Sequence, residues 1–344
     1  MTQPNSINQT FDTSLVDLKN TSFSTTESDS STSASAAHPT TSTPAQQHQE
    51  TPSTQEPPHQ SASTPNAAQV KHLPTQLAYD QWADIYDTDG NMLQAIDDIE
   101  VAALLPSFLL KVRCNNSSND HGNNSGPPAD AGTAVKTLSL IDLGCGTGRN
   151  TAKLLTTRST NAENMHVTGL DFSAGMLQRA KANLEGLTGP SRAIKLEHVD
   201  CFPSAADAAA SPKPAIDIVP VSGLISTLVL EHIPLRPFFA TVAALLAPGG
   251  YALVSNMHGD MGRVSQAGFV DAQGVKVRGT SYAHTVQETF DEAVRAGFEV
   301  ASVRERAVEM EDVVEGRVGE RGKKWVGVRV WYGIVVRKVG VAVL

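Results

Sequence analysis

The sequence predicts an α/β domain with a doubly wound, mostly parallel sheet and an antiparallel hairpin at its C-terminal edge. Short apolar runs alternate with helix-like segments between residues 135 and 255, and two β-rich runs follow at residues 298–308 and 326–339. Strands that alternate with helices of this length pair in parallel through right-handed crossovers. The two terminal runs have no long helix between them and therefore fit an antiparallel pair at one sheet edge.

The first 70 residues differ in composition from the rest of the chain. Of the 344 residues, 40% are hydrophobic and the formal net charge is -9, but residues 21–70 contain no Lys or Arg and only Phe23 as an aromatic residue. A segment rich in Ser, Thr, Pro and Gln buries too little apolar surface to offset its ordering entropy. We predict a disordered tail at residues 1–70 and one folded domain at residues 71–344.

Composition also disfavours several classes of protein. The sequence begins without the basic and apolar regions of a secretory signal, and no apolar stretch approaches the ~20 residues of a membrane-spanning helix. Cys114, Cys145 and Cys201 lack the spacing of a metal site. These features predict a cytoplasmic protein with no metal and no membrane partner. The acidic balance disfavours a surface that follows nucleic-acid phosphates.

The folded domain is expected to begin with one helix and a surface loop. Residues 77–110 carry apolar side chains at helical spacing, and Pro106 is expected to break or kink this helix near its end. Residues 113–134 are polar, aperiodic and rich in Gly and Pro, which is typical of a long loop.

The alternating region and its continuation follow in order. We predict strands at residues 135–143, 166–170, 193–199, 224–230 and 251–255, helices at 148–156, 173–187 and 237–246, and a low-complexity loop at 204–214. Residues 261–284 are expected to contain an inserted helix and a turn in a position to act as a lid. Thr285 and Glu288 form a capping box, which predicts a helix that ends at Ala296.

A glycine-rich turn follows the first strand. In IDLGCGTGRN, residues 141–150, three glycines at alternate positions allow a tight turn into a helix and let a ligand approach main-chain N–H groups. The dinucleotide fingerprint G-x-G-x-x-G needs a small residue where this chain has Arg149. The turn also lacks the Gly-Lys-Ser/Thr ending of a nucleoside-triphosphate loop.

Asp142 stands immediately before this turn. Its carboxylate would repel a pyrophosphate at the helix N-terminus, but it suits a ligand that carries an ammonium group and a sulfonium. S-adenosylmethionine carries both, and the N–H groups of the turn can hold its carboxylate. A purely local role for Asp142, as the cap of a turn, is the alternative.

Two further carboxylates follow later strands at equal spacing. Asp171 comes 29 residues after Asp142 (171 − 142) and Asp200 another 29 later (200 − 171). Asp171 can accept both ribose hydroxyls, although a structural role beside a helix cap stays open. Asp200 can take the adenine amino group, with Cys201 and Phe202 beside the ring. Open α/β sheets bind ligands at this edge of the strands.

Five motifs in order resemble the class I S-adenosylmethionine-dependent methyltransferase family. The likeness is to its ubiquinone/menaquinone-type and fungal secondary-metabolite small-molecule enzymes. The motifs are YDQWADIYD (79–87), LIDLGCGTGRN (140–150), VTGLDFSAGML (167–177), STLVLEHI (226–233) and LLAPGGYALVS (245–255). The ordered set is far more specific than the glycine turn alone. The resemblance implies a Rossmann-like sheet that ends in the antiparallel hairpin.

The resemblance also implies how the cofactor is held. Tyr86 would lie over the cofactor, the glycine turn would hold its methionine part, and Asp171 and Asp200 would bind ribose and adenine. The expected cofactor-binding residues are Tyr86, Asp142, Gly144, Cys145, Gly146, Thr147, Gly148, Asn150, Asp171, Phe172, Met176, Asp200, Cys201, Phe202 and Leu228. In the family, an acidic residue commonly opens the fourth strand. This chain departs from that pattern, because either Asp217 or the Gly223 position could align with that acidic residue.

Methyl transfer is an in-line displacement, so the protein chiefly has to hold the nucleophile and the methyl group in line, which can contribute ~7–11 kcal/mol. No single catalytic residue is required, but a hydroxyl acceptor benefits from a base. His284, just before the capped helix, and His258, after the fifth strand, are the candidate bases. Capping or packing is the alternative role of each. His232 is interpreted as structural.

The predicted activity is transfer of a methyl group from S-adenosylmethionine to N, O or S of a small, apolar or aromatic metabolite, by a monomer or homodimer. An NAD(P)-dependent oxidoreductase is the second class, disfavoured by Asp142 and Arg149. A regulatory or protein-directed S-adenosylmethionine-binding protein is the third. An RNA substrate is disfavoured, because the sequence shows no basic groove with interleaved aromatic residues, which binding of a single strand requires.

Overall fold

The computed structural model describes residues 70–119, 137–157, 163–202 and 218–339. The predicted tail, apart from Val70, lies outside the described residues. So do the loop at 204–214 and the part of the loop at 113–134 that follows residue 119.

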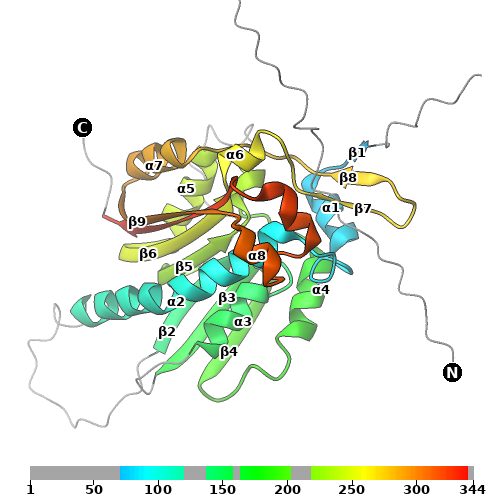
Figure 1. The fold of residues 1–344 in the computed structure, drawn as a ribbon. Helices are drawn as coiled ribbons and strands as arrows, with labels where there is room; N and C mark the ends of the chain where they lie inside the picture. The colour runs from blue at the N-terminus through cyan, green and yellow to red at the C-terminus, as the bar shows by residue number, and fades with distance from the viewer. Residues whose placement is uncertain (1–69, 120–136, 158–162, 203–217, 340–344) are drawn as a thin grey trace, which may run out of the picture. The chain divides into compact units, whose positions relative to one another are not determined.

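A seven-stranded sheet forms the centre of the described domain, with the strand order β4-β3-β2-β5-β6-β10-β9 (Figure 1). The strands are β2 (Thr137–Leu143), β3 (Asn164–Asp171), β4 (Arg192–His198), β5 (Val221–Thr227), β6 (Leu246–Met257), β9 (Phe298–Ala307) and β10 (Arg329–Lys338). The first five pair in parallel, and β10 pairs antiparallel with both β6 and β9. The predicted fold class is confirmed, including the antiparallel hairpin at the edge.

The strand order reverses beside β2. The chain runs outward from β2 through β3 to β4, and then returns to place β5 on the other side of β2. Open α/β sheets bind ligands at this kind of switch point, beyond the carboxyl ends of the strands. The glycine turn leaves β2 at that end. The fold therefore brings the turn and the ends of β3, β4 and β5 to one edge.

Helices cover both faces of the sheet. The face with α2 (Met92–Asn119), α3 (Arg149–Thr156) and α4 (Ala174–Asn183) buries Leu138 and Leu140 of β2 in one apolar cluster. The face with α5 (Leu235–Leu245) and α7 (Val286–Arg295) buries Ile141 and Leu143 in another. Side chains alternate between faces along a strand, so a strand covered on both sides is apolar throughout.

The single helix predicted over residues 77–110 is wrong. The structure has two helices, α1 (Thr75–Trp82) and α2, separated by a turn in which Gly90 has a φ of 73°. The Asn91 side chain then accepts the N–H of Leu93 and so supports the start of α2.

Pro106 does not end α2, which continues to Asn119 and so includes the first residues of the predicted loop. A proline inside a helix costs roughly 3 kcal/mol. The buried side chains Leu105, Phe108 and Leu109 on either side of the proline pack in the core, which offsets that cost.

The insertion after β6 contains more β-structure than predicted. A short helix, α6 (Gly259–Gly262), is followed by a hairpin of β7 (Gly268–Val270) and β8 (Lys276–Arg278). Strand β1 (Val70–His72) pairs in parallel with β8. Phe269 of the hairpin stacks on Trp82 with 5.4 Å between ring centroids, and this contact anchors the insertion against α1.

Two boundaries near the site also bear on the predictions. The fourth parallel strand is Val221–Thr227, three residues earlier than predicted, and a 3-10 turn, Leu230–His232, follows it. The capping box of Thr285 and Glu288 is confirmed at the start of α7. Within the described ranges, no helix is long and apolar enough to cross a membrane.

Candidate functional site

A cavity of about 670 Å³ lies beyond the carboxyl ends of β2, β3, β4 and β5. Each of these strands is ended or followed by a residue that lines the cavity, namely Gly144, Asp171, Asp200 and Leu228. Tyr79 of α1 also lines it. The volume lies in the range of sites for a ligand of cofactor size. The fold thus places a single large cavity at the edge where its topology favours binding.

The glycine turn forms one wall, with its three glycines in the left-handed region at φ values of 73°, 54° and 81°. A Cβ at Gly144 would lie 2.3 Å from Cγ2 of Val229, so a side chain does not fit there. A Cβ at Gly146 would meet nothing within 4 Å, and Gly146 lines the cavity. Open space beside an exposed main chain is what a close-lying ligand needs.

Asp171 presents a buried carboxylate to the cavity. It is 7% exposed, and it accepts the N–H of Gly146 and the N–H of Ser173, each at 2.8 Å. Burial raises its pKa to about 6, although these N–H groups favour the charged form. Each oxygen of a carboxylate can accept more than one hydrogen bond. Asp171 can therefore still accept from a pair of hydroxyl groups.

The far end of the cavity is apolar. Met176 and Phe172 line it beside Phe202, whose ring is stacked on Phe238 with 5.8 Å between centroids. Asp200 is exposed at this end and accepts the N–H of Phe202 at 2.9 Å. An aromatic, apolar surface with an acceptor at its rim suits a nucleobase that carries an exocyclic amine.

The cavity carries no fixed positive charge. Within the described part of the chain, no Lys or Arg lines it, and burial lowers the pKa of His232 to about 4, which keeps that imidazole neutral at pH 7. A pyrophosphate would face carboxylates here with no cation to balance it. The cavity fits a nucleoside that bears a cationic group, as S-adenosylmethionine does.

Leu228 marks a strained point of the wall. Its φ of 55° makes it the one non-glycine residue with a positive φ among the described residues. Its N–H is held by the carbonyl of Ser255. Such strain costs roughly 1–3 kcal/mol and concentrates at functional sites.

A hydrogen-bonded chain crosses the wall next to Leu228. Nδ1 of His232 lies 2.6 Å from the carbonyl oxygen of Thr280, and Nε2 lies 2.7 Å from the hydroxyl of Tyr79. Because a carbonyl only accepts, Nδ1 carries the proton and Nε2 accepts from Tyr79. All three residues line the cavity. His232 therefore orients the Tyr79 hydroxyl.

Comparison with known proteins shows the family of this chain. A family model described as a methyltransferase domain matches residues 141–252. A protein of Emericella nidulans described as an uncharacterized methyltransferase is 44% identical over 285 residues, covering 77% of this chain and 91% of that protein. The chain belongs to the class I S-adenosylmethionine-dependent methyltransferase family.

Two solved structures are similar in fold to this methyltransferase. A putative S-adenosylmethionine dependent methyltransferase from Listeria monocytogenes has 19% identity and a TM-score of 0.40, and covers 59% of this chain and 92% of that one. An S-adenosylmethionine dependent methyltransferase from Mesorhizobium loti has 21% identity and a TM-score of 0.39, with the same coverage of 59% and 92%.

Most of the residues predicted to bind the cofactor meet in the large cavity of the methyltransferase. Those that line it are Tyr86, Gly144, Gly146, Asp171, Phe172, Met176, Asp200, Cys201, Phe202 and Leu228. They come from different strand ends and from the segment after α1, so only the folded chain brings them together.

Asp142 lies behind this cavity and not in its lining. It is fully buried, one of its oxygens accepts from the Thr151 hydroxyl, and burial raises its pKa to about 7. Its Oδ1 has no hydrogen-bond partner among the described residues. The nearby charge of Asp171 also raises the pKa of Asp142. This free acceptor next to the glycine turn is consistent with a ligand that supplies a donor.

Cys145, Thr147 and Gly148 also lie outside the lining. The Thr147 hydroxyl donates to Asp87 at 2.7 Å, which ties the glycine turn to the segment after α1. A Cβ at Gly148 would lie 2.8 Å from Leu184, so this glycine allows α3 and α4 to pack closely. Cys145 is buried against Gly169. These residues support the conformation of the glycine turn without lining the cavity.

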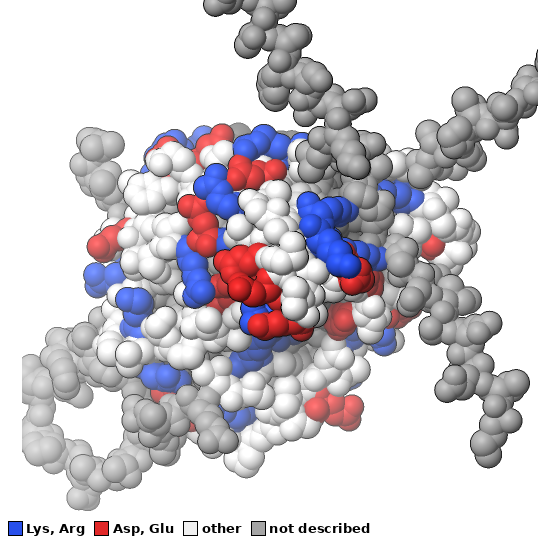
Figure 2. All heavy atoms as spheres, viewed as in Figure 1, with Lys and Arg blue, Asp and Glu red and all other residues white. Residues whose placement is uncertain are grey.

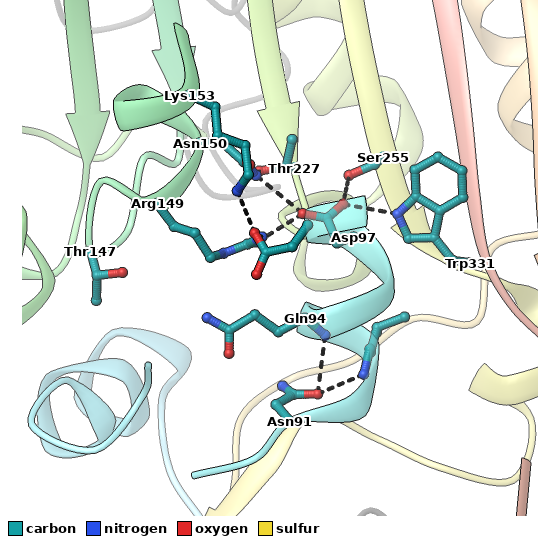
Figure 3. A network of polar contacts seen from close by, with 12 residues as sticks. Asn91, Gln94, Asp97, Thr147, Arg149, Asn150, Lys153, Thr227, Ser255 and Trp331 are labelled. Carbon is teal, nitrogen blue, oxygen red and sulfur yellow. Dashed lines mark hydrogen bonds and ion pairs between the residues drawn. The ribbon is translucent and has the colours of Figure 1, made fainter. Parts of the chain in front are cut away.

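Asn150 belongs to a buried polar network centred on Asp97 of α2 (Figure 3). Its amide donates to Asp97 at 3.1 Å and to the hydroxyl of Thr227 at 2.8 Å, and Thr227 lines the cavity. Arg149 donates to the same Asp97 carboxylate at 2.8 Å. The two residues that follow the glycine turn therefore attach it to α2 and to the end of β5.

The structure places neither candidate base in the cavity. His258 is the N-cap residue of α6, where its Nδ1 accepts the N–H of Asp260 and its Nε2 lies 2.9 Å from Glu305. His284 binds the carbonyl of Ile233 at 2.9 Å and stacks on Tyr282. Both histidines have capping and packing contacts.

No individual binding role was assigned from the sequence to Tyr79, Glu231 or His232. Tyr79 and His232 line the large cavity, and Glu231 lines a smaller cavity beside it. Two of them lie in the motif LEHI, where His232 was interpreted as structural, and Tyr79 opens the motif YDQWADIYD. Both motifs carried the family resemblance. The polar residues within these two motifs were the signal that could have pointed to them.

Proposed function

We propose that this methyltransferase transfers a methyl group from S-adenosylmethionine to a nitrogen, oxygen or sulfur atom of a small-molecule metabolite. One observation carries the proposal. A single cavity combines a main-chain opening at Gly146, the Asp171 carboxylate and an apolar end at Phe202, and no cation lines it within the described residues. This order of groups matches a ligand that is cationic at one end and a nucleoside at the other.

Each part of the cofactor has residues that suit it. The glycine turn would hold the methionine part, with the unpartnered oxygen of Asp142 close behind it. Asp171 would accept the ribose hydroxyls, and Asp200 with Phe202 would bind adenine. When bound, S-adenosylmethionine supplies a methyl group activated by a sulfonium. The remaining task of the protein is to orient the acceptor and exclude water.

The acceptor would approach past Tyr79 and Leu228, which lie at the boundary between the large cavity and a smaller one. Thr75 and Tyr79 of α1 line the cavity together with Thr280 and Tyr282, and a partly enclosed space of this volume suits a compact substrate. On the face drawn in Figure 2, Lys and Arg alternate with Asp and Glu among the described residues. That mixture supports a metabolite over a nucleic acid as the acceptor.

The composition supports further proposals about context. We propose a cytoplasmic enzyme of secondary metabolism that works as a monomer or homodimer, because its cysteines form no disulfide framework and its likeness is to small-molecule enzymes.

The decisive experiment is a transfer assay with methyl-labelled S-adenosylmethionine against a metabolite extract, with mass spectrometry of the labelled products. We expect a labelled small molecule with the wild type and none with Asp171→Ala. Binding of S-adenosylhomocysteine but not NAD, by calorimetry, would separate this enzyme from an oxidoreductase. Label only in proteins would favour the protein-directed alternative.

A further inference from the structure

We infer that the methyl acceptor is an amine that enters as an ammonium ion, bound between the carboxylate of Glu231 and the rings of Tyr79, Trp82 and Tyr86. The inference rests on the proposed methyl transfer and names its substrate class. The location is a second, small cavity beside the large one.

The second cavity is small and adjoins the large one. Its volume is about 20 Å³, and it shares Tyr79, Tyr86 and Leu228 with the lining of the large cavity. A space of this size holds roughly one water molecule, and the head of a primary amine is of similar size. The cavity therefore fits the reacting head of an acceptor, while the body of that molecule would occupy the larger space.

Glu231 supplies the carboxyl group that lines this cavity. It is 3% exposed, and its Oε2 has no hydrogen-bond partner among the described residues. Its Oε1 lies 3.6 Å from Nε2 of His232, which is already engaged by Tyr79. Burial raises the pKa of Glu231 to about 8, so the neutral acid predominates at pH 7 while the cavity holds no ligand. A cationic ligand supplies the countercharge that favours the carboxylate form.

Three aromatic rings line the same cavity and contact one another. The ring centroids are 5.5 Å apart for Tyr79 and Trp82, 5.0 Å for Trp82 and Tyr86, and 6.0 Å for Tyr79 and Tyr86. Aromatic faces attract ammonium groups, most strongly where water is excluded. Within the described ranges, no Lys or Arg lines this cavity. A carboxylate acceptor would find no countercharge here, and a neutral hydroxyl could form no ion pair with Glu231.

The same arrangement prepares the amine to react. An ammonium ion has no free electron pair, so one N–H bond must break before the nitrogen can attack. The proton passes to Oε2 of Glu231, the electron pair stays on nitrogen, and the ion pair becomes a neutral acid and a neutral amine. Burial, with the charge of Asp97, raises the pKa of Glu231 to about 8, which brings it closer to that of an amine.

The other titratable groups around Glu231 do not compete for this proton. His232 is kept neutral because burial lowers its pKa to about 4. Burial raises the pKa of Tyr79, Tyr86 and Tyr332 well above their usual value, so these phenols stay protonated. Glu231 is then the one group in this cavity that changes charge when an amine binds.

The test compares ligands with the same carbon frame, using calorimetry on the full chain saturated with S-adenosylhomocysteine. Phenethylamine, 2-phenylethanol and phenylacetate are titrated into the wild type, Glu231→Gln and the control Glu185→Gln, which changes an exposed glutamate outside both cavities. We expect phenethylamine to bind the wild type and the control about 10-fold or more tightly than 2-phenylethanol. Phenylacetate should bind weakest.

In Glu231→Gln the preference for the amine should disappear while affinity for S-adenosylhomocysteine and the thermal midpoint stay within error. Equal affinity for amine and alcohol in the wild type, no binding of the amine, or an unchanged preference in Glu231→Gln would overturn the inference. Failure of S-adenosylhomocysteine itself to bind would instead overturn the proposed function. The two failures are therefore distinguished by the first titration.

Discussion

At the scale of single residues, three buried carboxyl groups differ in what surrounds them. Asp142 accepts a hydrogen bond from the Thr151 hydroxyl, and Asp171 accepts hydrogen bonds from two main-chain N–H groups. Glu231 has one oxygen without a hydrogen-bond partner among the described residues. Burial raises the pKa of all three, to about 7, 6 and 8. Strongly shifted pKa values cluster at functional sites, because the chemistry there needs groups whose pKa is matched to their task.

Asp171 leads to a pH-dependent prediction. Its folded-state pKa is raised above that of the unfolded chain, so its charged form destabilises the fold and stability from this group rises as the pH falls through about 6. Cofactor binding needs the charged form of Asp171, so the affinity for the cofactor falls over the pH range in which the stability of the fold rises. We predict that affinity for S-adenosylhomocysteine falls about tenfold between pH 7 and pH 5.

Calorimetry across this range checks the prediction, with Asp171→Asn as the control because Asp142 titrates nearby. The Asn variant should bind weakly at every pH, and most of the slope should be lost. An identical slope in both proteins would assign the pH dependence to another group.

At the scale of elements, the turn from β2 into α3 determines how closely a ligand approaches the main chain. Gly146 lies in the left-handed region, with open space where a Cβ would stand. Gly274, in the β7–β8 turn, has the same properties at a φ of 76° and does not line either cavity. The two positions form a matched pair for substitution.

We predict that Gly146→Ala and Gly274→Ala lower the free energy of unfolding by a similar amount, about 1–2 kcal/mol. Only Gly146→Ala should weaken binding of S-adenosylhomocysteine, because the methyl group points into the space that the ligand needs. Urea unfolding and calorimetry of both variants check this. Unimpaired binding by Gly146→Ala would show that the ligand does not approach this turn.

At the scale of the whole molecule, Asp97 joins segments that are far apart in the sequence. It accepts hydrogen bonds from the side chains of Arg149, Asn150, Ser255 and Trp331 (Figure 3), and it is fully buried. These donors come from α3, β6 and β10, so one carboxylate of α2 connects the glycine turn to the sheet. Removing one partner of a buried ion pair leaves an uncompensated charge.

We therefore predict that Asp97→Ala lowers the free energy of unfolding by about 3–5 kcal/mol. Asp98 is the control, since it also pairs with Arg149 but its side chain is 39% exposed. Asp98→Ala should cost about 1 kcal/mol or less. Urea unfolding of both variants measures the difference, and equal losses would remove the special role of Asp97.

The N-terminal region gives a prediction at the same scale. Among the described residues, those that line the two cavities begin at Pro74. We predict that a chain lacking residues 1–69 binds S-adenosylhomocysteine with unchanged affinity and methylates the same metabolite. Loss of labelled product with intact cofactor binding would instead assign the region a role in capturing the acceptor.

The sequence by itself was sufficient to predict the sheet, the glycine turn and the acidic residues at the strand ends. Apolar periodicity and turn residues are local, and parallel strands place their carboxyl ends at one edge in any doubly wound fold. Asp171 and Asp200 follow from that rule alone. The single helix predicted over residues 77–110 failed because its break at Gly90 interrupts apolar spacing only briefly.

Only the tertiary structure decided which side chains reach the cavity. Asn150 belongs to the glycine motif yet points to Asp97, whereas Glu231 and His232, in a motif whose histidine was interpreted as structural, line the two cavities. The orientation of a side chain depends on partners more than fifty residues away, such as Tyr79 or Asp97. Local patterns carry no information about these partners, because the contacts exist only after the chain has packed.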